Sequence, residues 1–291
     1  MDSGTLGKLN FMAEGAESSL YRNGKVFIRR DAAGDDAKLS GLDVQECRMS
    51  IANARELRLP PDLDYNGFEL VPDHPVSANL DFRDSAAVIK VYYPICEALL
   101  ADRTGGKVFA FDHNVRSATG KAAGAEIDGG QKVQGPAHMV HGDYTLRSAS
   151  ERLLQLSGMP SGNDTLKGFI EAPLIPTSLV ETCQRFAIIN VWRNIDSLPV
   201  ASHPLALCDG QTVEPEDLVV FEIHYSDRIG ENYFSKAAPR HRFYYWPEMT
   251  GSEELLIKQW DSGGNLAMTA GAEADQDGHP CTFSFHTAFV P

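Results

Sequence analysis

The sequence predicts an α+β protein whose core is a double-stranded β-helix, the jelly-roll architecture of cupin-like proteins. Beyond residue 105, short apolar or β-branched runs alternate with polar turns. This sequence pattern favours a barrel or jelly roll, because a parallel sheet needs a helix between each pair of strands. The expected strands are Lys107–Phe111, Ala137–Tyr144, Phe186–Trp192, Leu205–Cys208, Leu218–Tyr225, His241–Trp246, Leu255–Trp260 and Thr282–Phe289.

The residues before this region are expected to form a helical N-terminal buttress of mixed α/β structure, spanning 1–104. Between Phe82 and Arg103, apolar residues recur at i, i+3, i+4 and i+7, which is typical of an amphipathic helix. Pro94 should kink or split this helix. One more helix is expected at Ser148–Ser157. The 291 residues suit a single domain, with the jelly-roll core at 105–291.

Composition limits the class of protein and its partners. The chain is 43% hydrophobic and 23% charged, which is ordinary for a soluble globular protein. Its net charge of −14 argues against a nucleic-acid or anionic-membrane partner. We see neither a secretory signal nor a membrane span, and five scattered cysteines support no disulfide framework. We therefore expect a cytoplasmic protein. The net charge says nothing about a small apolar substrate, and such a substrate and a homodimer are the partners that we expect.

The most informative motif is His141-Gly-Asp143. Side chains alternate across a strand, so His141 and Asp143 should point to the same face. One more histidine from a distant strand completes a 2-His-1-carboxylate facial triad, the ligand set of non-haem Fe(II) oxygenases. Alone the motif is weak, because a chain with nine histidines is about as likely as not to contain one by chance.

The third ligand must come from a later strand, and the later histidines are His203, His224, His241, His279 and His286. We select His286, because it lies in the last apolar strand, which should face the His141 strand. His241 is the competitor. For each of them a hydrogen-bonded structural role is the alternative.

Several short strings occur in the order found in one known family: Phe111-Asp-His-Asn-Val-Arg116, Val140-His-Gly-Asp-Tyr-Thr145, Asn190-Val-Trp-Arg193, Pro204-Leu-Ala-Leu-Cys-Asp209, Phe243-Tyr-Tyr-Trp-Pro-Glu-Met249, Leu255-Leu-Ile-Lys-Gln-Trp-Asp-Ser262 and His286-Thr-Ala-Phe289. From about Asp62 onward the chain thus resembles the fungal hydroxylase/desaturase family of AsaB type, which includes the small subunit of the cephamycin 7-alpha-methoxylase. The resemblance implies an Fe(II)/2-oxoglutarate-dependent dioxygenase that hydroxylates or desaturates a small secondary metabolite in a fungal biosynthetic pathway.

The resemblance also implies roles for individual residues. His141, Asp143 and His286 are the expected iron ligands and catalytic residues. In the family, a strand with Arg-Glu-Ser-Ile-Glu-Val-Arg character follows His-Thr-Ala-Phe, and its last Arg is expected to pair with the distal carboxylate of 2-oxoglutarate. The sequence here ends at Pro291. Arg193 and Arg116 are the candidate substitutes, because Arg suits a bidentate carboxylate clamp. A structural salt bridge is the alternative for both.

Other functions stay open at this stage. The scaffold could serve a non-oxidative, isomerase-like enzyme or a binding or partner protein that no longer uses 2-oxoglutarate. A cupin-like sugar or storage binder is disfavoured by the family strings. A Ser-His-Asp hydrolase is disfavoured because the sequence lacks a G-x-S-x-G elbow. Trp192, Tyr244, Tyr245 and Trp246 could line an apolar pocket or simply fill the core.

Overall fold

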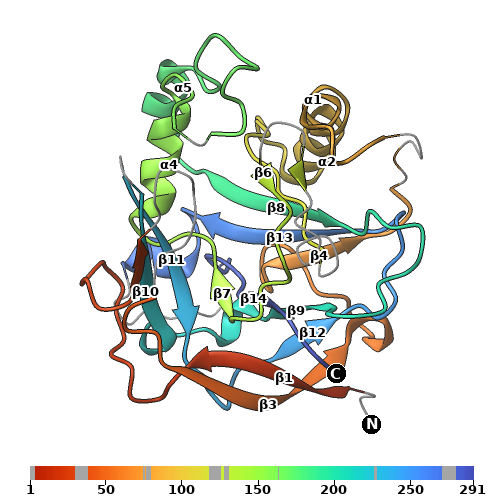
Figure 1. The fold of residues 1–291 in the computed structure, drawn as a ribbon, viewed down its shortest axis with the longest axis vertical. Helices are drawn as coiled ribbons and strands as arrows, with labels where there is room; N and C mark the ends of the chain where they lie inside the picture. Colours follow the sequence, from red (N-terminus) through yellow and green to blue (C-terminus); the bar gives the residue numbers. More distant parts are fainter. Residues whose placement is uncertain are drawn as a thin grey trace. The chain divides into compact units, whose positions relative to one another are not determined.

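Figure 1 shows the helices and strands of the computed structural model. The chain divides into two compact units. The first unit comprises Met1–Pro72, Ala137–Ser150 and Gln184–Pro291, and the second comprises Asp73–Pro136 and Glu151–Cys183. The structure describes residues 4–29, 39–74, 76, 80–117, 126–127, 131–162, 164–225, 228–270 and 280–291.

A large mixed sheet dominates the first unit. Its strand order is β1-β3-β12-β9-β14-β7-β11-β10-β2. The strands are β1 (Thr5–Met12), β2 (Phe27–Arg29), β3 (Val44–Asn53), β7 (His141–Gly142), β9 (Leu205–Cys208), β10 (Leu218–His224), β11 (Ile229–Ser235), β12 (Phe243–Tyr245) and β14 (His286–Ala288). A second, antiparallel sheet has the order β4-β13-β8, formed by β4 (Phe68–Val71), β13 (Glu254–Asp261) and β8 (Ala187–Arg193).

The two sheets pack on each other through a shared apolar core. Leu207 of β9 meets Phe68 of β4 and Leu255 of β13 in one cluster of buried side chains. Both sheets must cover an apolar face, and packing these faces together removes them from water. This two-sheet arrangement is consistent with the predicted jelly-roll core.

The N-terminal segment contributes strands to these sheets. In β1 the buried residues Leu9 and Phe11 alternate with the less buried Lys8 and Asn10, which is the period of a half-buried strand. β1 pairs antiparallel with β3, and β3 pairs parallel with β12. Among the described residues before Pro72, the regular elements are strands β1 to β4 and one 3-10 turn, and a helical N-terminal buttress stays a prediction.

The helix expected between Phe82 and Arg103 is present in the second unit. It consists of α1 (Ser85–Ala87), a π-helical turn at Val88–Tyr92 and α2 (Tyr93–Thr104). Pro94 is the second residue of α2 and follows the π-helical turn directly, where the hydrogen-bond pattern of the helix changes. The helix ends at Gly105, whose φ of 67° is the left-handed conformation that glycine adopts without strain. A buttressing role for this helix stays a prediction.

The remaining elements are short. The helix expected at Ser148–Ser157 is α4 (Ser148–Leu156). The others are β5 (Glu126–Ile127), β6 (Gln131–Lys132), α5 (Thr177–Thr182) and α6 (Asn265–Thr269), together with 3-10 turns at Ala54–Glu56, Gly210–Thr212 and Pro215–Asp217. Within the described ranges, no helix combines the length and apolar character needed to cross a membrane.

A buried ion pair joins β8 to β13. Arg193 and Glu254 are register partners on the two strands. Arg193 donates from Nε and Nη2 to Oε1 of Glu254, at 2.9 and 2.6 Å, and the two side chains are only 4% and 0% exposed. Removing one member would leave the other charge buried without its partner, which is far more costly than losing an exposed pair.

We therefore expect Arg193→Gln to lower the free energy of unfolding by about 3–5 kcal/mol. Arg55, whose pair with Glu253 is partly exposed, is the control, and Arg55→Gln should cost about 1 kcal/mol or less. Urea denaturation followed by circular dichroism measures both. Adding Glu254→Gln to Arg193→Gln should recover part of the loss. Equal losses in the two single variants would contradict the structural role assigned to Arg193.

Candidate metal centre

Two histidines face each other across neighbouring strands. β14 pairs antiparallel with β7, and the register places His286 directly opposite His141. On its other side β14 pairs with β9, where His286 is opposite Leu207. Directly opposed residues in an antiparallel pair project to the same face of the sheet. The two imidazole rings accordingly lie with their centroids 4.3 Å apart.

Asp143 joins the same face through the alternation of the strand. His141 and Asp143 flank Gly142, which projects to the opposite face. A Cβ at Gly142 would lie 3.3 Å from the ring of Phe283 and 3.7 Å from the ring of Phe285. The glycine thus allows two aromatic rings to pack against the back of the motif, while the imidazole and the carboxylate point away from them.

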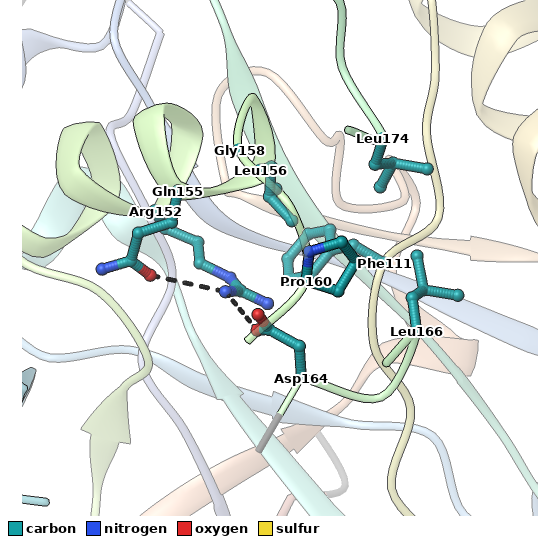
Figure 2. A pocket seen from close by; sticks show the side chains of 9 residues that line it. All are labelled: Phe111, Arg152, Gln155, Leu156, Gly158, Pro160, Asp164, Leu166 and Leu174. Atoms are coloured by element: carbon teal, nitrogen blue, oxygen red, sulfur yellow. Dashed lines mark hydrogen bonds and ion pairs between the residues drawn. The ribbon is translucent and has the colours of Figure 1, made fainter. Parts of the chain in front are cut away.

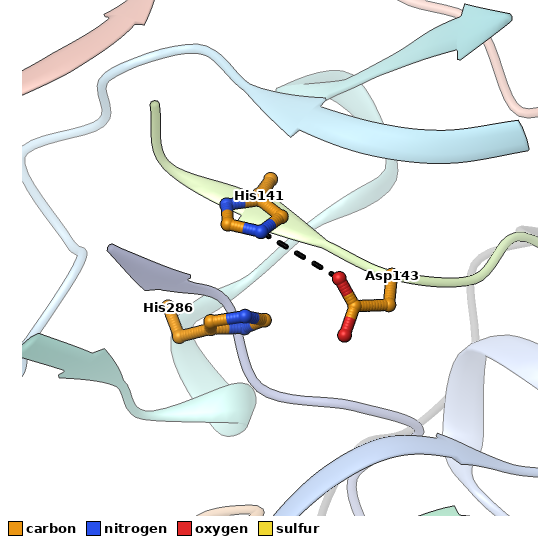
Figure 3. A group of neighbouring side chains, drawn as sticks. All are labelled: His141, Asp143 and His286. Carbon is orange, nitrogen blue, oxygen red and sulfur yellow. Dashed lines mark ion pairs between the residues drawn. The ribbon is translucent and has the colours of Figure 1, made fainter. Parts of the chain in front are cut away.

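The three side chains converge on one point (Figure 3). One ligand atom from each of His141, Asp143 and His286 lies within 4.8 Å of the other two. Oδ1 of Asp143 is 3.5 Å from Nε2 of His141. His141 is buried, whereas Asp143 and His286 are partly exposed, so the cluster is anchored in the sheet and open on one side.

The backbone fixes which nitrogen of His141 is available. Nδ1 of His141 lies 2.7 Å from the carbonyl oxygen of Met139. A carbonyl only accepts hydrogen bonds, so Nδ1 carries the proton and donates it. Nε2 then presents its lone pair towards Asp143. A second hydrogen bond of this kind is what orients metal-binding histidines in proteins.

Carboxamides surround Asp143, and sequence reasoning did not select them. Asn190 of β8 donates from Nδ2 to Oδ2 of Asp143 at 2.9 Å. The Asp143 backbone N–H donates to Oε1 of Gln259 at 3.2 Å. Nε2 of the fully buried Gln259 has no hydrogen-bond partner among the residues that the structure describes. Their only sequence signal was their presence in two of the family strings.

These observations fit a divalent transition metal. Two imidazoles and one carboxylate are donors that such ions prefer, and three protein ligands on one side leave positions open for other ligands. The buried Nε2 of Gln259 is a hydrogen-bond donor that a further molecule bound beside Asp143 could use. The residues present therefore match an Fe(II) centre, and their role as ligands is taken up below as a proposal.

The other histidines lie elsewhere. The buried His241 pairs through Nε2 with Oδ2 of Asp217 at 2.9 Å. His224 pairs with Glu222 at 2.8 Å, and His203 packs edge-on against the ring of His138. His279 lies outside the described residues. The competitor His241 is thus engaged with a carboxylate away from the His141–Asp143 pair.

The two candidate arginines are found in different environments. The guanidinium of Arg193 is bound to Glu254 and also donates to the carbonyl oxygen of Gly251. Arg116 belongs to the second unit, is exposed and donates to the carbonyl oxygen of Gly135 at 3.1 Å. Arg193 thus forms a structural salt bridge, which was the alternative to a role in binding 2-oxoglutarate. That binding role stays a prediction for both arginines.

Most of the aromatic residues considered for a pocket belong to the core. The buried Trp246 lies in the cluster between the two sheets, with Trp192 and Tyr244 packed against it. Tyr245 packs edge-on against Phe289, with ring centroids 5.3 Å apart. These four side chains therefore give no support for an apolar substrate site.

A hollow in the second unit is also not an anion site (Figure 2). Arg152 is its only basic side chain, and Nη1 of Arg152 is 2.7 Å from Oδ1 of Asp164. The guanidinium also lies over the ring of Phe111, at 5.1 Å from the centroid. The positive charge is thus already neutralised by an ion pair within the hollow.

Comparisons with known proteins place the chain in a family. Residues 9–290 match the model of the oxidoreductase/YMDC permease-like domain. A bacterial protein encoded in the dcmA 3′ region of Methylophilus leisingeri is 43% identical over 197 residues, covering 65% of this chain and 90% of that protein. The Fe(II)/2-oxoglutarate-dependent dioxygenase nvfI of Aspergillus novofumigatus is 30% identical over 218 residues, covering 72% of this chain and 68% of its own length.

A solved structure supports the same kinship at the level of the fold. The iron and alpha-ketoglutarate-dependent endoperoxidase NvfI superposes with a TM-score of 0.69 at 22% identity, covering 99% of this chain and 92% of that chain. The likeness supports the predicted jelly-roll class. The resemblance inferred from the motifs is confirmed. The chain therefore belongs to the oxidoreductase family that the matched model describes, and fungal Fe(II)/2-oxoglutarate-dependent dioxygenases and hydroxylase/desaturases are among its homologues.

Proposed function

We propose that this protein is an Fe(II)/2-oxoglutarate-dependent dioxygenase that hydroxylates or desaturates a small secondary metabolite. The observation that carries the proposal is the convergence of two imidazoles and one carboxylate within 4.8 Å, in a member of this oxidoreductase family. His141, Asp143 and His286 are the proposed metal ligands. When bound, iron with 2-oxoglutarate supplies the oxidising power for attack on a C–H bond.

The chain's own residues hold and shape the centre. His141 offers Nε2 because Met139 fixes its tautomer, and Asp143 offers one negatively charged oxygen. Phe283 and Phe285 pack behind Gly142 and keep water from the back of the motif. The protein thus positions the proposed metal ligands, provides a negative charge and excludes water on one side. The other side stays open to further ligands.

The finer expectations belong to this proposal as well. We propose an apolar metabolite as the substrate, a cytoplasmic location and a homodimer. The acidic net charge of −14 supports the absence of a nucleic-acid partner. A fungal pathway is supported by the fungal dioxygenases and hydroxylase/desaturases among the homologues, although the relative in Methylophilus leisingeri is bacterial.

Replacing one ligand should abolish tight metal binding without unfolding the protein. We expect Asp143→Ala to lose Fe(II) after dialysis at micromolar metal, because two imidazoles alone form a weak site. His224→Ala, which alters a partly exposed histidine paired with Glu222, is the control and should keep its iron. Metal analysis with circular dichroism measures both. Full iron occupancy in Asp143→Ala would remove Asp143 from the ligand set.

Binding of 2-oxoglutarate separates the proposed oxygenase from a non-oxidative or binding protein on the same scaffold. Titrating the anaerobic Fe(II) protein with 2-oxoglutarate should produce the weak visible charge-transfer band of a chelated complex. The band should be absent from His286→Ala, which lacks one proposed ligand. A wild-type protein that binds Fe(II) but never shows the band would support the non-oxidative alternative.

Arg116 and Arg193 remain our two candidates for the distal carboxylate of 2-oxoglutarate. Arg116→Gln is the cleaner test, because Arg193→Gln also breaks the buried pair with Glu254. If Arg116 supplies the clamp, its replacement should weaken 2-oxoglutarate binding at least about tenfold, equivalent to about 1.4 kcal/mol, with Fe(II) binding unchanged. If the affinity for 2-oxoglutarate is unchanged in Arg116→Gln and in the folded fraction of Arg193→Gln, neither arginine binds the distal carboxylate.

A further inference from the structure

Three side-chain amides from three different strands hold Asp143. Asn190 of β8 binds the carboxylate, Gln259 of β13 binds the backbone N–H, and Asn232 of β11 lies at the backbone carbonyl. In the amide orientation that satisfies its hydrogen bonds, Nδ2 of Asn232 donates to the carbonyl oxygen of Asp143 at 3.3 Å and to that of Glu231 at 3.1 Å. Each polar group of Asp143 therefore meets one carboxamide.

Asn190 distinguishes the two oxygens of the carboxylate. Its Nδ2 donates to Oδ2 at 2.9 Å. Oδ1 is the oxygen that faces Nε2 of His141, at 3.5 Å. Since Oδ2 is fixed by this hydrogen bond, rotation of the carboxylate is restrained and Oδ1 stays turned towards the histidines. The geometry favours a ligand that binds metal through one oxygen.

An irregularity in β13 brings Gln259 to Asp143. Lys258 pairs with Ile189 and Trp260 with Ile188, so Gln259 is an extra residue between two consecutive partners on β8. Such a β-bulge turns a side chain away from its regular direction. Gln259 is fully buried, and within the described part of the chain its side chain makes one hydrogen bond, which Oε1 accepts from the backbone N–H of Asp143. A buried amide with an unmet donor is costly unless a ligand uses it.

The chemistry of the amide group suits this task. A carboxamide donates and accepts hydrogen bonds but carries no charge. On the same strand, Asp261 is held by Arg185 at 2.7 Å and by Lys258 at 3.0 Å, so its charge is already neutralised. The amides at Asp143 restrain the carboxylate through hydrogen bonds and do not themselves bring a positive charge to it.

We propose that Asn190, Gln259 and Asn232 form a carboxamide clamp that positions Asp143 as a one-oxygen metal ligand, with Asn190 as its principal member. The clamp rests on the proposed metal site and assigns to these three residues a positioning role that acts through Asp143. Outer partners of this kind orient the ligand and set its basicity, and their loss typically costs about 10- to 100-fold in metal affinity.

The test is a Co(II) titration of the purified protein, read by affinity and by the visible d–d spectrum. Asn190→Leu keeps the approximate volume of the side chain but removes the donor to Oδ2. We expect about 10- to 100-fold weaker Co(II) binding and a changed spectrum, because the carboxylate is then free to rotate. Gln259→Met, which removes the acceptor for the Asp143 N–H, should also weaken binding. The Gln259→Met variant keeps the proposal testable if Asn190→Leu does not fold.

A matched control lies four residues away. Asn194 is buried, whereas Asn190 is partly exposed, and Asn194 donates to the carbonyl oxygens of Leu198 and Met249 and not to a proposed ligand. Asn194→Leu should lower stability while leaving the Co(II) affinity and spectrum of the folded protein unchanged. Wild-type affinity and spectrum in both Asn190→Leu and Gln259→Met would overturn the clamp and leave the metal site intact. A wild-type protein that binds no Co(II) would overturn the clamp and the proposed function together.

Discussion

The register between β14 and β7 is the constraint on which the candidate site depends. A shift of one residue would place Phe285 or Thr287, in place of His286, opposite His141, because side chains alternate along a strand. Both of these neighbours are fully buried, so such a shift would force His286 into the core and expose apolar surface. A hydrogen bond from Ala288 N to Ala137 O holds β14 beside the segment that leads into β7, and one from Cys208 N to Phe285 O holds β14 against β9 on its other side. The packing of the core thereby sets the distance between the two imidazoles.

Carboxylates of the first unit are held in two distinct ways. Glu254 and Asp261 lie on β13 and are paired with arginine or lysine side chains, which stabilise the sheet. Burial on its own raises the pKa of Asp261, but hydrogen bonds from Arg185 and attraction to Lys258 hold it below its ordinary value. Asp143 instead receives hydrogen bonds from neutral amides. The first arrangement stabilises the sheet, and the second holds the carboxylate of Asp143 by hydrogen bonds at the proposed metal site.

The sequence predicted the parts of the fold and the site that depend on local patterns. Alternation within His141-Gly-Asp143 and the position of His286 in the last apolar strand were enough to select three residues that the structure brings together. The Asn190 contact joins residues 47 positions apart, and no local pattern reports it. Gln259 was hidden because every residue of β13 is buried, so alternation gives no direction, and the bulge is visible only from the pairing with β8.

Strands β1 and β3 were obscured for a similar reason. Leu9 and Phe11 alternate with polar residues, but the sheet that buries them is formed by segments from the other end of the sequence, through β3 and β12. A jelly roll is built mainly from such non-local pairs, so its edge strands are difficult to assign from one segment alone. The helix ending at Gly105, whose stabilising pattern is local, was predicted correctly.

The central claim is that His141, Asp143 and His286 hold one metal ion. A crystal structure of the Fe(II)-soaked protein under anaerobic conditions, with anomalous data at the iron edge, tests it most directly. The account predicts a single strong peak at about 2.0–2.3 Å from Nε2 of His141, Oδ1 of Asp143 and a ring nitrogen of His286, with Asn190 still bound to Oδ2. A peak at His241 and Asp217, or no peak at the three residues, would contradict it.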